Sequence, residues 1–578
     1  METLQEAKLE DLIPLPYDNV RKAYERRISL LREAEESFLN KKKDQLPRLQ
    51  ALLHSFVREE DPSDISQISS LMQSLIIDST GFGSAQSRYA SRIKQNLEDT
   101  IGLEELHVYT RKDIATRLRR LYEDINPNFV LSTNAFVVDL GLKNTAAAFS
   151  IESSAMGVDI DGKAIPGVLL MCGYSILDLV DNSDFIGDVG LSCKQEVLTP
   201  LENAKFRPYL ISKLTLSDQE KAVIDDMMEM YRPGETEFNA KLLMKAIGNV
   251  VSRQFSSFDY NDLQTLNLKG DDPDAQQKKD KIFHDTYDQG LSIGGTVLVA
   301  SAYAIRLTLQ KNGEELPDMP NNPDYNLSWG GNFLRFVYGN EATERPDFQQ
   351  RAKAMDTYFQ LIRTHGPGNA STFAVRAAAS AYTDLPGALN SGINVLSGDR
   401  HGFAAVLSYQ QVSQAYDRLR EQHGHISRHF IAEEVARIYR EEGVFQGFGH
   451  PVYKRPRERT PPGDPRFGIM REIIQSWGDS EIQRKMQFYN EWDNQVGDFT
   501  KREKGSSAGF PANVDLLTPI LLQDRIGLPP EANPLMFYCG REFGHVLHYI
   551  EAIQFPLIRS RGLYEGPRAR EIKPVNNF

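Results

Sequence analysis

The sequence predicts a mostly α-helical protein with a minor β-hairpin region and an extra helical extension at its N-terminus. Apolar residues recur at helical spacing through most of the 578 residues, which is the pattern of helices that bury one face. β-branched and apolar residues broken by glycine are confined to one region that begins near residue 128, where short strands and hairpins are expected. No internal repeat is visible along the chain.

The first 128 residues are expected to form a helical unit of their own. The segment VRKAYERRISLLREAEESFLNKKK, residues 20–43, places its apolar residues near one helical face. DPSD at 61–64 is a helix-start signal, and further helices are expected over 84–97 and 110–124. The basic clusters of this region are most simply solvated helix faces, and a site for a polyanion is the alternative.

After the hairpin region the chain becomes helical again. Charge and helical periodicity return from Ser217, and helices dominate again from about residue 370. Between them the segment GLSIGGTVLVASAYAIRLTLQ, residues 290–310, predicts a buried helix. Polar loops are expected at 271–281 and 312–326.

The composition excludes several classes of protein. The formal net charge of −13 argues against a general nucleic-acid binder, whose affinity rests on basic surface. Cys172, Cys193 and Cys539 form no CxxC or His/Cys cluster, so we expect no disulfides and no metal site, and we expect reduced thiols in the cytoplasm. The acidic N-terminus lacks the apolar core of a signal peptide. No apolar run reaches the ~18 residues that a membrane span needs, so no membrane partner is expected.

Three of the eleven histidines lie at glycine-containing breaks between predicted helices. His365 stands in THGPGNAST, where Asn369 or Ser371 can cap the next helix. His401 stands in LSGDRHGFAAV, just before a helix whose N-terminus disfavours imidazolium and keeps a nearby histidine neutral. His450 stands in VFQGFGHPVYKR, on a turn fixed by glycine and proline. Such breaks aim side chains into a cleft.

The other histidines that we considered are expected to be structural, because a buried histidine is usually a hydrogen-bonded part of the core. These are His54, His107, His284 and His545.

Charged residues in apolar surroundings form a second group of candidates. Asp515 is the lone charge before an apolar helix, where a carboxyl group has a raised pKa that suits a general base. Arg466 follows Asp464 on a turn, Arg541 faces an otherwise apolar helix, and Arg559 lies near the C-terminus. Because arginine binds carboxylates through two parallel hydrogen bonds, these residues predict a site for an anionic substrate. A structural ion pair is the alternative for each.

Six motifs follow one another in the second half of the chain. They are HGPGN (365–369), GDRHG (398–402), GFGHPVYK with DPR (447–466), NVD (513–515), GR (540–541) and LIRSRGLY (557–564). In their order and in much of their spacing these motifs resemble the citrate synthase family. The resemblance covers about 290 to 578, including SWGGNFLRFVYG at 328–339, and extends more faintly back to about 130.

The resemblance implies a citrate synthase-like fold, a mostly helical homodimer with its active site in the cleft between two domains. Residues 129–395 and 510–578 would form the large domain, and 396–509 the small domain. Residues 1–128 would be an extension that the basic family lacks.

The resemblance also implies a reaction, that of an acyltransferase which converts the acyl group into an alkyl group on transfer. Asp515 would remove a proton from the methyl group of acetyl-coenzyme A. His401 would hydrogen-bond the thioester oxygen and stabilise the enol, and His450 would polarise the ketone of oxaloacetate. Hydrolysis of citryl-coenzyme A would then give citrate and coenzyme A. No metal or further cofactor is implied.

The matching motifs also imply binding residues for both substrates. The oxaloacetate carboxylates would be held by His365, Arg466 and Arg541, with Arg559 supplied by the partner subunit. The residues implied for coenzyme A binding are Val444, Gly447, Phe448, Gly449, Lys454 and Lys504.

The resemblance does not determine which acyl-coenzyme A is the substrate. Acetyl-coenzyme A, the substrate of the tricarboxylic acid cycle, is the default. Propionyl-coenzyme A or a longer acyl group, giving 2-methylcitrate or a longer alkylcitrate, is the second reading. Departures from the family pattern bear on this choice: Phe403 stands where a small residue is usual, Pro451 follows His450, and RPRERTPPG is inserted at 455–463.

Two further readings are less well supported. A citryl-coenzyme A lyase is disfavoured because those relatives tend to have phenylalanine where His401 stands. A family member that has become a binding or assembly protein is disfavoured by the intact His401, His450 and Asp515.

Overall fold

The structure is a computed structural model. It describes residues 9–12, 151–158, 164–254, 273–424, 426–449, 463–504 and 509–553, together with a few isolated positions. The chain divides into two compact units, one of Met1–Arg27 and Ala146–Pro556 and one of Ile28–Thr145 and Leu557–Phe578. The helices expected at 20–43, 84–97 and 110–124 lie outside the described residues, and the expected domain boundaries stay a prediction.

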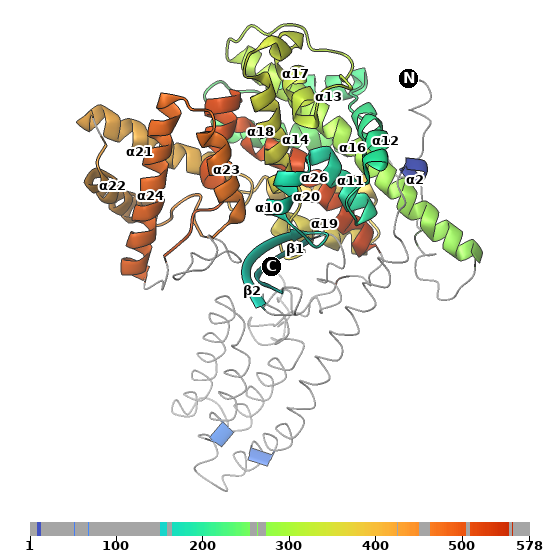
Figure 1. Cartoon of the computed structure of the whole chain (residues 1–578), viewed down its shortest axis with the longest axis horizontal. Helices are drawn as coiled ribbons and strands as arrows, with labels where there is room; N and C mark the ends of the chain where they lie inside the picture. Colours follow the sequence, from blue (N-terminus) through green and yellow to red (C-terminus); the bar gives the residue numbers. More distant parts are fainter. Residues whose placement is uncertain are drawn as a thin grey trace, which may run out of the picture. The chain divides into compact units, whose positions relative to one another are not determined.

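The first unit is mostly helical, as the sequence predicts (Figure 1). Its α-helices are α2 (Leu9–Leu12), α10 (Ile176–Asn182), α11 (Phe185–Lys194), α12 (Pro200–Ser212), α13 (Asp218–Met228), α14 (Thr236–Val251), α16 (Pro273–Lys311), α17 (Trp329–Tyr338), α18 (Phe348–Ile362), α19 (Ala370–Ser380), α20 (Leu385–Leu396), α21 (Ala404–His423), α22 (Arg428–Glu442), α23 (Pro465–Gln475), α24 (Ser480–Lys504), α25 (Val514–Pro519) and α26 (Asn533–Ala552). Short 3₁₀ helices η2 (Asn340–Glu344) and η4 (Pro530–Ala532) and a π-helical stretch η3 (Ile520–Ile526) complete the helical elements.

The strands lie in the region that the sequence predicts for hairpins. β1 (Ile151–Val158), β2 (Ala164–Met171) and β3 (Tyr174–Ser175) form one antiparallel sheet in the order β1-β2-β3. Ser154 pairs with Val168 in the β1–β2 register. The part of the hairpin region before residue 151 lies outside the described residues.

Local signals in the sequence fix several helix starts. The helix expected from Ser217 is present as α13, which Ser217 caps through a capping box with Glu220. Helical structure returns earlier than expected, however, because α10 already begins at Ile176. The loop expected at 271–281 is wrong, since α16 already begins at Pro273. Proline suits the first position of a helix, and the Ala, Gln and Lys residues that follow are good helix formers.

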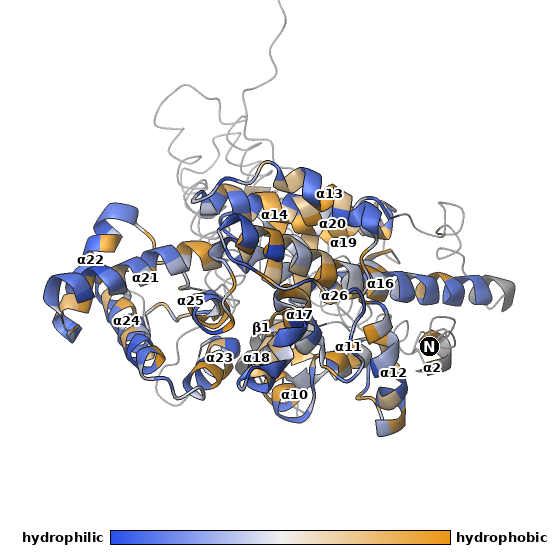
Figure 2. Ribbon diagram, turned by 90° about the horizontal axis from the view of Figure 1, so that it is seen from above, coloured by the Kyte–Doolittle hydropathy of each residue, from blue (hydrophilic) through white to orange (hydrophobic). Residues whose placement is uncertain are grey.

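Two long helices, α16 and α26, pack together in the core of the first unit. The buried helix expected at 290–310 is confirmed as part of α16, whose polar first turns are blue in Figure 2. By length and hydropathy, residues 277–311 of α16 could also cross a membrane, but 83% of the apolar window is buried inside the protein. Every residue of α26 is buried, so α26 is a core helix along its whole length.

The helices α21, α22 and α24 form a separate group at the left of Figure 1. Aromatic side chains hold this group together. The rings of Tyr416 and Phe488 lie 5.2 Å apart between α21 and α24, and those of Tyr439 and Phe499 lie 5.0 Å apart between α22 and α24. The group packs against α25, which carries Asp515, and also against α23 and α26.

Candidate active site

The turn that carries His365 joins the end of α18 to the start of α19. Asn369 caps α19 by accepting a hydrogen bond from the backbone of Thr372, as one of the two caps expected from the sequence. His365 is buried, and its Nδ1 accepts a hydrogen bond of 2.8 Å from the backbone N–H of Gly366. Because Nδ1 accepts, the neutral ring carries its proton on Nε2 and presents a donor there.

His401 lies in the loop between α20 and α21, as expected. Its Nε2 is 2.9 Å from Oγ of Ser371, which stands in the first turn of α19. Burial, with a contribution from the nearby Arg541, lowers the pKa of His401 to about 4. The neutral imidazole predicted from the sequence is therefore confirmed. Burial is the main cause here, whereas the sequence argument rested on the start of α21.

Asp399 and Phe403 dock the loop of His401 onto α14. Asp399 forms an ion pair of 3.0 Å with Lys241 of α14. Phe403 is buried against Ala240 and Val406, and the ammonium group of Lys241 lies 5.3 Å from the centre of the Phe403 ring. The side chain of Phe403 thus anchors the loop of His401 on α14.

Asp515 is a buried carboxyl group in the first turn of α25. The backbone N–H of Asp515 donates to Oδ1 of Asn513, which caps the helix. Burial raises the pKa of Asp515, Arg466 and Arg541 lower it, and Asp464 raises it, which together place the pKa at about 6. Within the described part of the chain, Oδ1 of Asp515 has no hydrogen-bond partner. This carboxyl group has the environment of a general base.

Arg466 is held in one orientation by Asp464. Its Nε and Nη2 donate to the two carboxylate oxygens of Asp464 at 2.9 and 2.7 Å, and both residues are buried. Asp464 also caps α23 and accepts a hydrogen bond of 3.2 Å from the backbone of Val514. Asp464 therefore links the guanidinium group of Arg466 to the start of the helix that carries Asp515.

The segment before His450 pairs with the segment before Asp515. The backbone N–H of Gly449 donates to Pro511, and that of Asn513 donates to Gly447, both at 2.9 Å. Gly447 has a φ of +75°, and a Cβ at this position would lie 2.7 Å from Oγ of Ser408. Only glycine suits both the backbone conformation and the close approach. This explains why glycine stands at position 447, one of the positions expected to bring the backbone near coenzyme A.

Side chains of α21 hold the remainder of the loop expected to bind coenzyme A. Gln411 donates to the carbonyl of Val444 at 3.2 Å and accepts from the backbone of Gln446 at 2.9 Å. The side chain of Val444 is 47% exposed, and Phe448 is half-buried. An apolar surface at the edge of this loop is thus open to a ligand.

Arg541 connects the loop of His401 to the turn of His365. Its Nε donates to the carbonyl of Ile362 at 2.8 Å, and its guanidinium carbon lies 4.8 Å from the centre of the Phe537 ring. The Phe537 ring in turn lies 6.5 Å from that of His401. The charge of Arg541 affects the pKa of both His401 and Asp515, so these three residues share one electrostatic environment.

The structure thus links five of the residues expected at the site: His365, His401, Arg466, Asp515 and Arg541. His450, Lys454 and Arg559 lie outside the described residues, as does the side chain of Lys504. The sequence indicated neither the contact of Ser371 with His401 nor the contact of His548 with His365. Neither partner could be found from spacing, because 30 residues separate Ser371 from its histidine.

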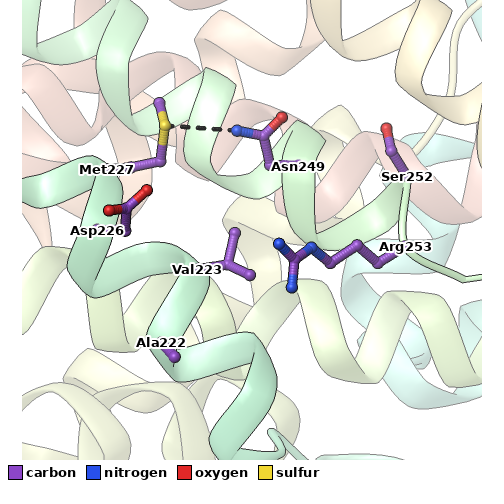
Figure 3. A pocket seen from close by; sticks show the side chains of 7 residues that line it. All are labelled: Ala222, Val223, Asp226, Met227, Asn249, Ser252 and Arg253. Atoms are coloured by element: carbon purple, nitrogen blue, oxygen red, sulfur yellow. Dashed lines mark hydrogen bonds between the residues drawn. The ribbon is translucent and has the colours of Figure 1, made fainter.

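A separate surface pocket of about 530 Å³ lies between α13 and α14 (Figure 3). Asp226 and Arg253 face it, and Nδ2 of Asn249 contacts Sδ of Met227 at 3.4 Å. None of the expected site residues lines this pocket, and we assign no ligand to it. Among the described residues, no group of three or more His, Cys, Asp or Glu side chains is placed to hold a metal ion.

Comparison with known proteins gives consistent results. A family model described as citrate synthase, C-terminal domain, matches residues 141–561. The citrate synthase of Corynebacterium glutamicum is 27% identical over 423 residues, which is 72% of this chain and 84% of that protein. The citrate synthase of Haloferax volcanii is 25% identical over 418 residues, which is 72% of this chain and 94% of that protein.

Solved structures agree in fold. The citrate synthase of Thermotoga maritima matches with a TM-score of 0.53 and 20% identity, over 73% of this chain and 95% of that one. The citrate synthase of Thermoplasma acidophilum, solved in a ternary complex with carboxymethyl coenzyme A and oxaloacetate, matches with a TM-score of 0.53 and 21% identity, over 73% and 94% of the two chains. At these identities the likeness establishes the mostly helical architecture.

Proposed function

The chain belongs to the citrate synthase family, and on this premise we propose that it condenses an acyl-coenzyme A thioester with oxaloacetate and hydrolyses the product. With acetyl-coenzyme A, the default substrate, the products are citrate and coenzyme A. The observation that carries the proposal is the joint placement of Asp515, His401 and two buried arginines in one electrostatic environment.

Asp515 is the proposed base. A thioester α-proton is a very weak acid, so the base must be ionised and close to the substrate, and the enolate must be stabilised as it forms. With a pKa of about 6, Asp515 is mostly ionised at pH 7 and is still more basic than an ordinary carboxylate. Its oxygen Oδ1, without a partner among the described residues, is available to a substrate proton.

His401 is the proposed donor to the thioester oxygen. A pKa of about 4 keeps the ring neutral, so it can donate a hydrogen bond without becoming a strong acid. The hydroxyl of Ser371 donates to Oδ1 of Asn369 at 3.0 Å and lies 2.9 Å from Nε2 of His401. When this hydroxyl turns to donate to Nε2 instead, the remaining ring proton of His401 stands on Nδ1. The positive charge of Arg541 nearby favours the negative charge that develops on the enolate.

Three described residues support the binding of oxaloacetate. His365 presents an Nε2–H donor, and Arg541 supplies positive charge in a buried setting. The buried Arg466 is ion-paired with Asp464, as the structural alternative predicted, and would add guanidinium N–H donors. The carboxylates of oxaloacetate would compensate part of this charge. We further propose that His450 polarises the ketone and that Arg559 comes from the partner subunit of a homodimer.

The proposal also includes a binding site for coenzyme A and a cellular compartment for the protein. Coenzyme A would bind along the loop that contains Val444 and Gly447 to Gly449, with Lys454 and Lys504 near its phosphates. The proposed chemistry uses protein side chains and the thioester itself, with no other cofactor. The cytoplasm is the proposed compartment.

The test is an assay of coenzyme A release with acetyl-, propionyl- and hexanoyl-coenzyme A, each with and without oxaloacetate. We expect release that depends on oxaloacetate, fastest with acetyl-coenzyme A. A higher kcat/KM with propionyl-coenzyme A would instead identify a 2-methylcitrate synthase. If none of the three thioesters releases coenzyme A in the presence of oxaloacetate, the proposed function is wrong.

A further inference from the structure

The core helix α26 clamps the turn of His365 at both of its ends. Nε of Arg541 donates to the carbonyl of Ile362, and Nε2 of His548 donates to the carbonyl of His365, each at 2.8 Å. The two donors stand two helical turns apart, about 10.5 Å along the axis. Both hydrogen bonds are present together, so α26 holds the turn at Ile362 and again at His365.

Two glycines let the turn come close enough for these bonds. A Cβ at Gly544 would lie 2.4 Å from the carbonyl oxygen of Arg363 and 2.5 Å from Cβ of Thr364. A Cβ at Gly540 would lie 2.6 Å from Cγ1 of Ile362. A side chain at either position would force its neighbour to shift, so α26 is bare at Gly544, between the two donors, and at Gly540, just before Arg541.

The partners of His548 determine which of its nitrogens carries the proton. A carbonyl oxygen only accepts, so the proton that bonds His365 stands on Nε2 of His548. Nδ1 of His548 faces both Nη1 of Arg376 at 3.2 Å and Oε2 of Glu551 at 3.6 Å. Arg376, which only donates, is the nearer partner, and the distance to Glu551 exceeds that of a hydrogen bond. Nδ1 therefore holds a lone pair, and His548 is a neutral ring with its proton on the nitrogen that faces His365.

A buried ion pair keeps this arrangement in place. Nη1 of Arg376 lies 2.6 Å from Oε2 of Glu551, and the two side chains are 0% and 1% exposed. Breaking such a pair would leave a buried charge without compensation, so the position of Arg376 beside His548 is firmly fixed. Arg376 belongs to α19, the helix that also carries Ser371 beside His401.

We propose that His548 is a positioning residue for oxaloacetate binding, which fixes the backbone of His365 while the Arg376–Glu551 pair holds its tautomer. The inference rests on the proposed function, in which His365 binds an oxaloacetate carboxylate. A buried hydrogen bond to the backbone of His365 sets where its ring lies, and small misplacements of a binding group weaken a site strongly. His548 itself need not touch the substrate.

The test compares His548→Gln, His548→Asn and His548→Leu in the full-length protein. The amide nitrogen of glutamine can take the place of Nε2 and donate to His365, whereas asparagine reaches only the place of Nδ1. We expect the glutamine variant to keep the KM for oxaloacetate within about threefold, and the other two to raise it about tenfold or more. The KM for the acyl-coenzyme A should change by less than about threefold in all three.

His545→Leu is the matched control. His545 is also a fully buried histidine, one turn earlier in α26, and within the described chain neither of its ring nitrogens has a hydrogen-bond partner. Its replacement should leave the KM for oxaloacetate unchanged, whatever its effect on the melting temperature. If His548→Leu does not fold, the glutamine and asparagine variants, which differ by one methylene group, decide the question.

Three results would overturn the proposal. An asparagine variant with the oxaloacetate KM of the wild type would show that the bond to His365 does not matter, while the proposed function would stand. Equal losses for both substrates in all His548 variants and in His545→Leu would show a general structural role. A wild-type protein without oxaloacetate-dependent release would instead refute the proposed function, and this inference with it.

Discussion

Gly544→Ala is the substitution whose effect follows most directly from the packing of α26. The added Cβ would lie 2.4 Å from the carbonyl oxygen of Arg363, where ordinary contacts begin at 3.4 Å. The turn must therefore retreat by about 1 Å. The clamping hydrogen bonds from Arg541 and His548, now 2.8 Å each, would lengthen to about 3.8 Å, beyond hydrogen-bonding range.

The expected loss in the free energy of unfolding is the sum of the contributions of these changes. Overpacking a well-packed core costs about 1–3 kcal/mol, and each lost hydrogen bond about 1 kcal/mol. We expect the free energy of unfolding to fall by about 3–5 kcal/mol, measured by urea denaturation, and the KM for oxaloacetate to rise as the turn moves.

Gly468→Ala is the matched control for this substitution. Gly468 also lies in a helix, α23, and a Cβ there would meet no atom within 4 Å. Alanine at such a site is expected to be neutral or to stabilise by up to about 1 kcal/mol. If Gly544→Ala unfolds at the same urea concentration as Gly468→Ala, the close packing of the turn on α26 is refuted.

Three further predictions concern the site and its supports. Because Asp515 must be ionised to act as a base and burial raises its pKa to about 6, kcat/KM should fall about tenfold per pH unit below pH 6; an acid limb centred at pH 4 would contradict this. Ser371→Ala removes the partner of Nε2 of His401 and should lower kcat about tenfold with little change in melting temperature. An unchanged kcat would show that Ser371 does not set the tautomer of His401. Phe403→Ala should lower the free energy of unfolding by about 3 kcal/mol, because the ring is 1% exposed; a loss below about 1 kcal/mol in urea denaturation would mean that the ring does not anchor the loop.

Much of the fold could be predicted from local sequence. The apolar run at 290–310 is a buried helix because its composition allows little else, and Asn369 caps α19 because its amide oxygen satisfies a free N–H at the helix start. The start of α16 was mistaken for a loop at 271–281, because a run of charged residues is equally common in loops and on exposed helix turns.

The order of the motifs located the site residues, but their partners depend on tertiary packing. His548 lies 183 residues from His365, and no periodicity connects them. Likewise, Arg541 attracted attention as an arginine in an apolar helix, whereas the two glycines that bring the turn to it are explained only by the contacts a Cβ would make. Which side chains meet across two helices is decided by the packing of both.

The measurement that tests the central claim most directly is the rate of coenzyme A release from acetyl-coenzyme A, with and without oxaloacetate, for the wild type and Asp515→Asn. Asparagine keeps the shape of the side chain and removes its basicity. We expect release by the wild type to require oxaloacetate, and kcat of the variant to fall by about 10² or more, with a melting temperature close to that of the wild type. Release that is independent of oxaloacetate, or a variant as active as the wild type, would contradict the assignment of Asp515 as the base of a citrate synthase-type condensation.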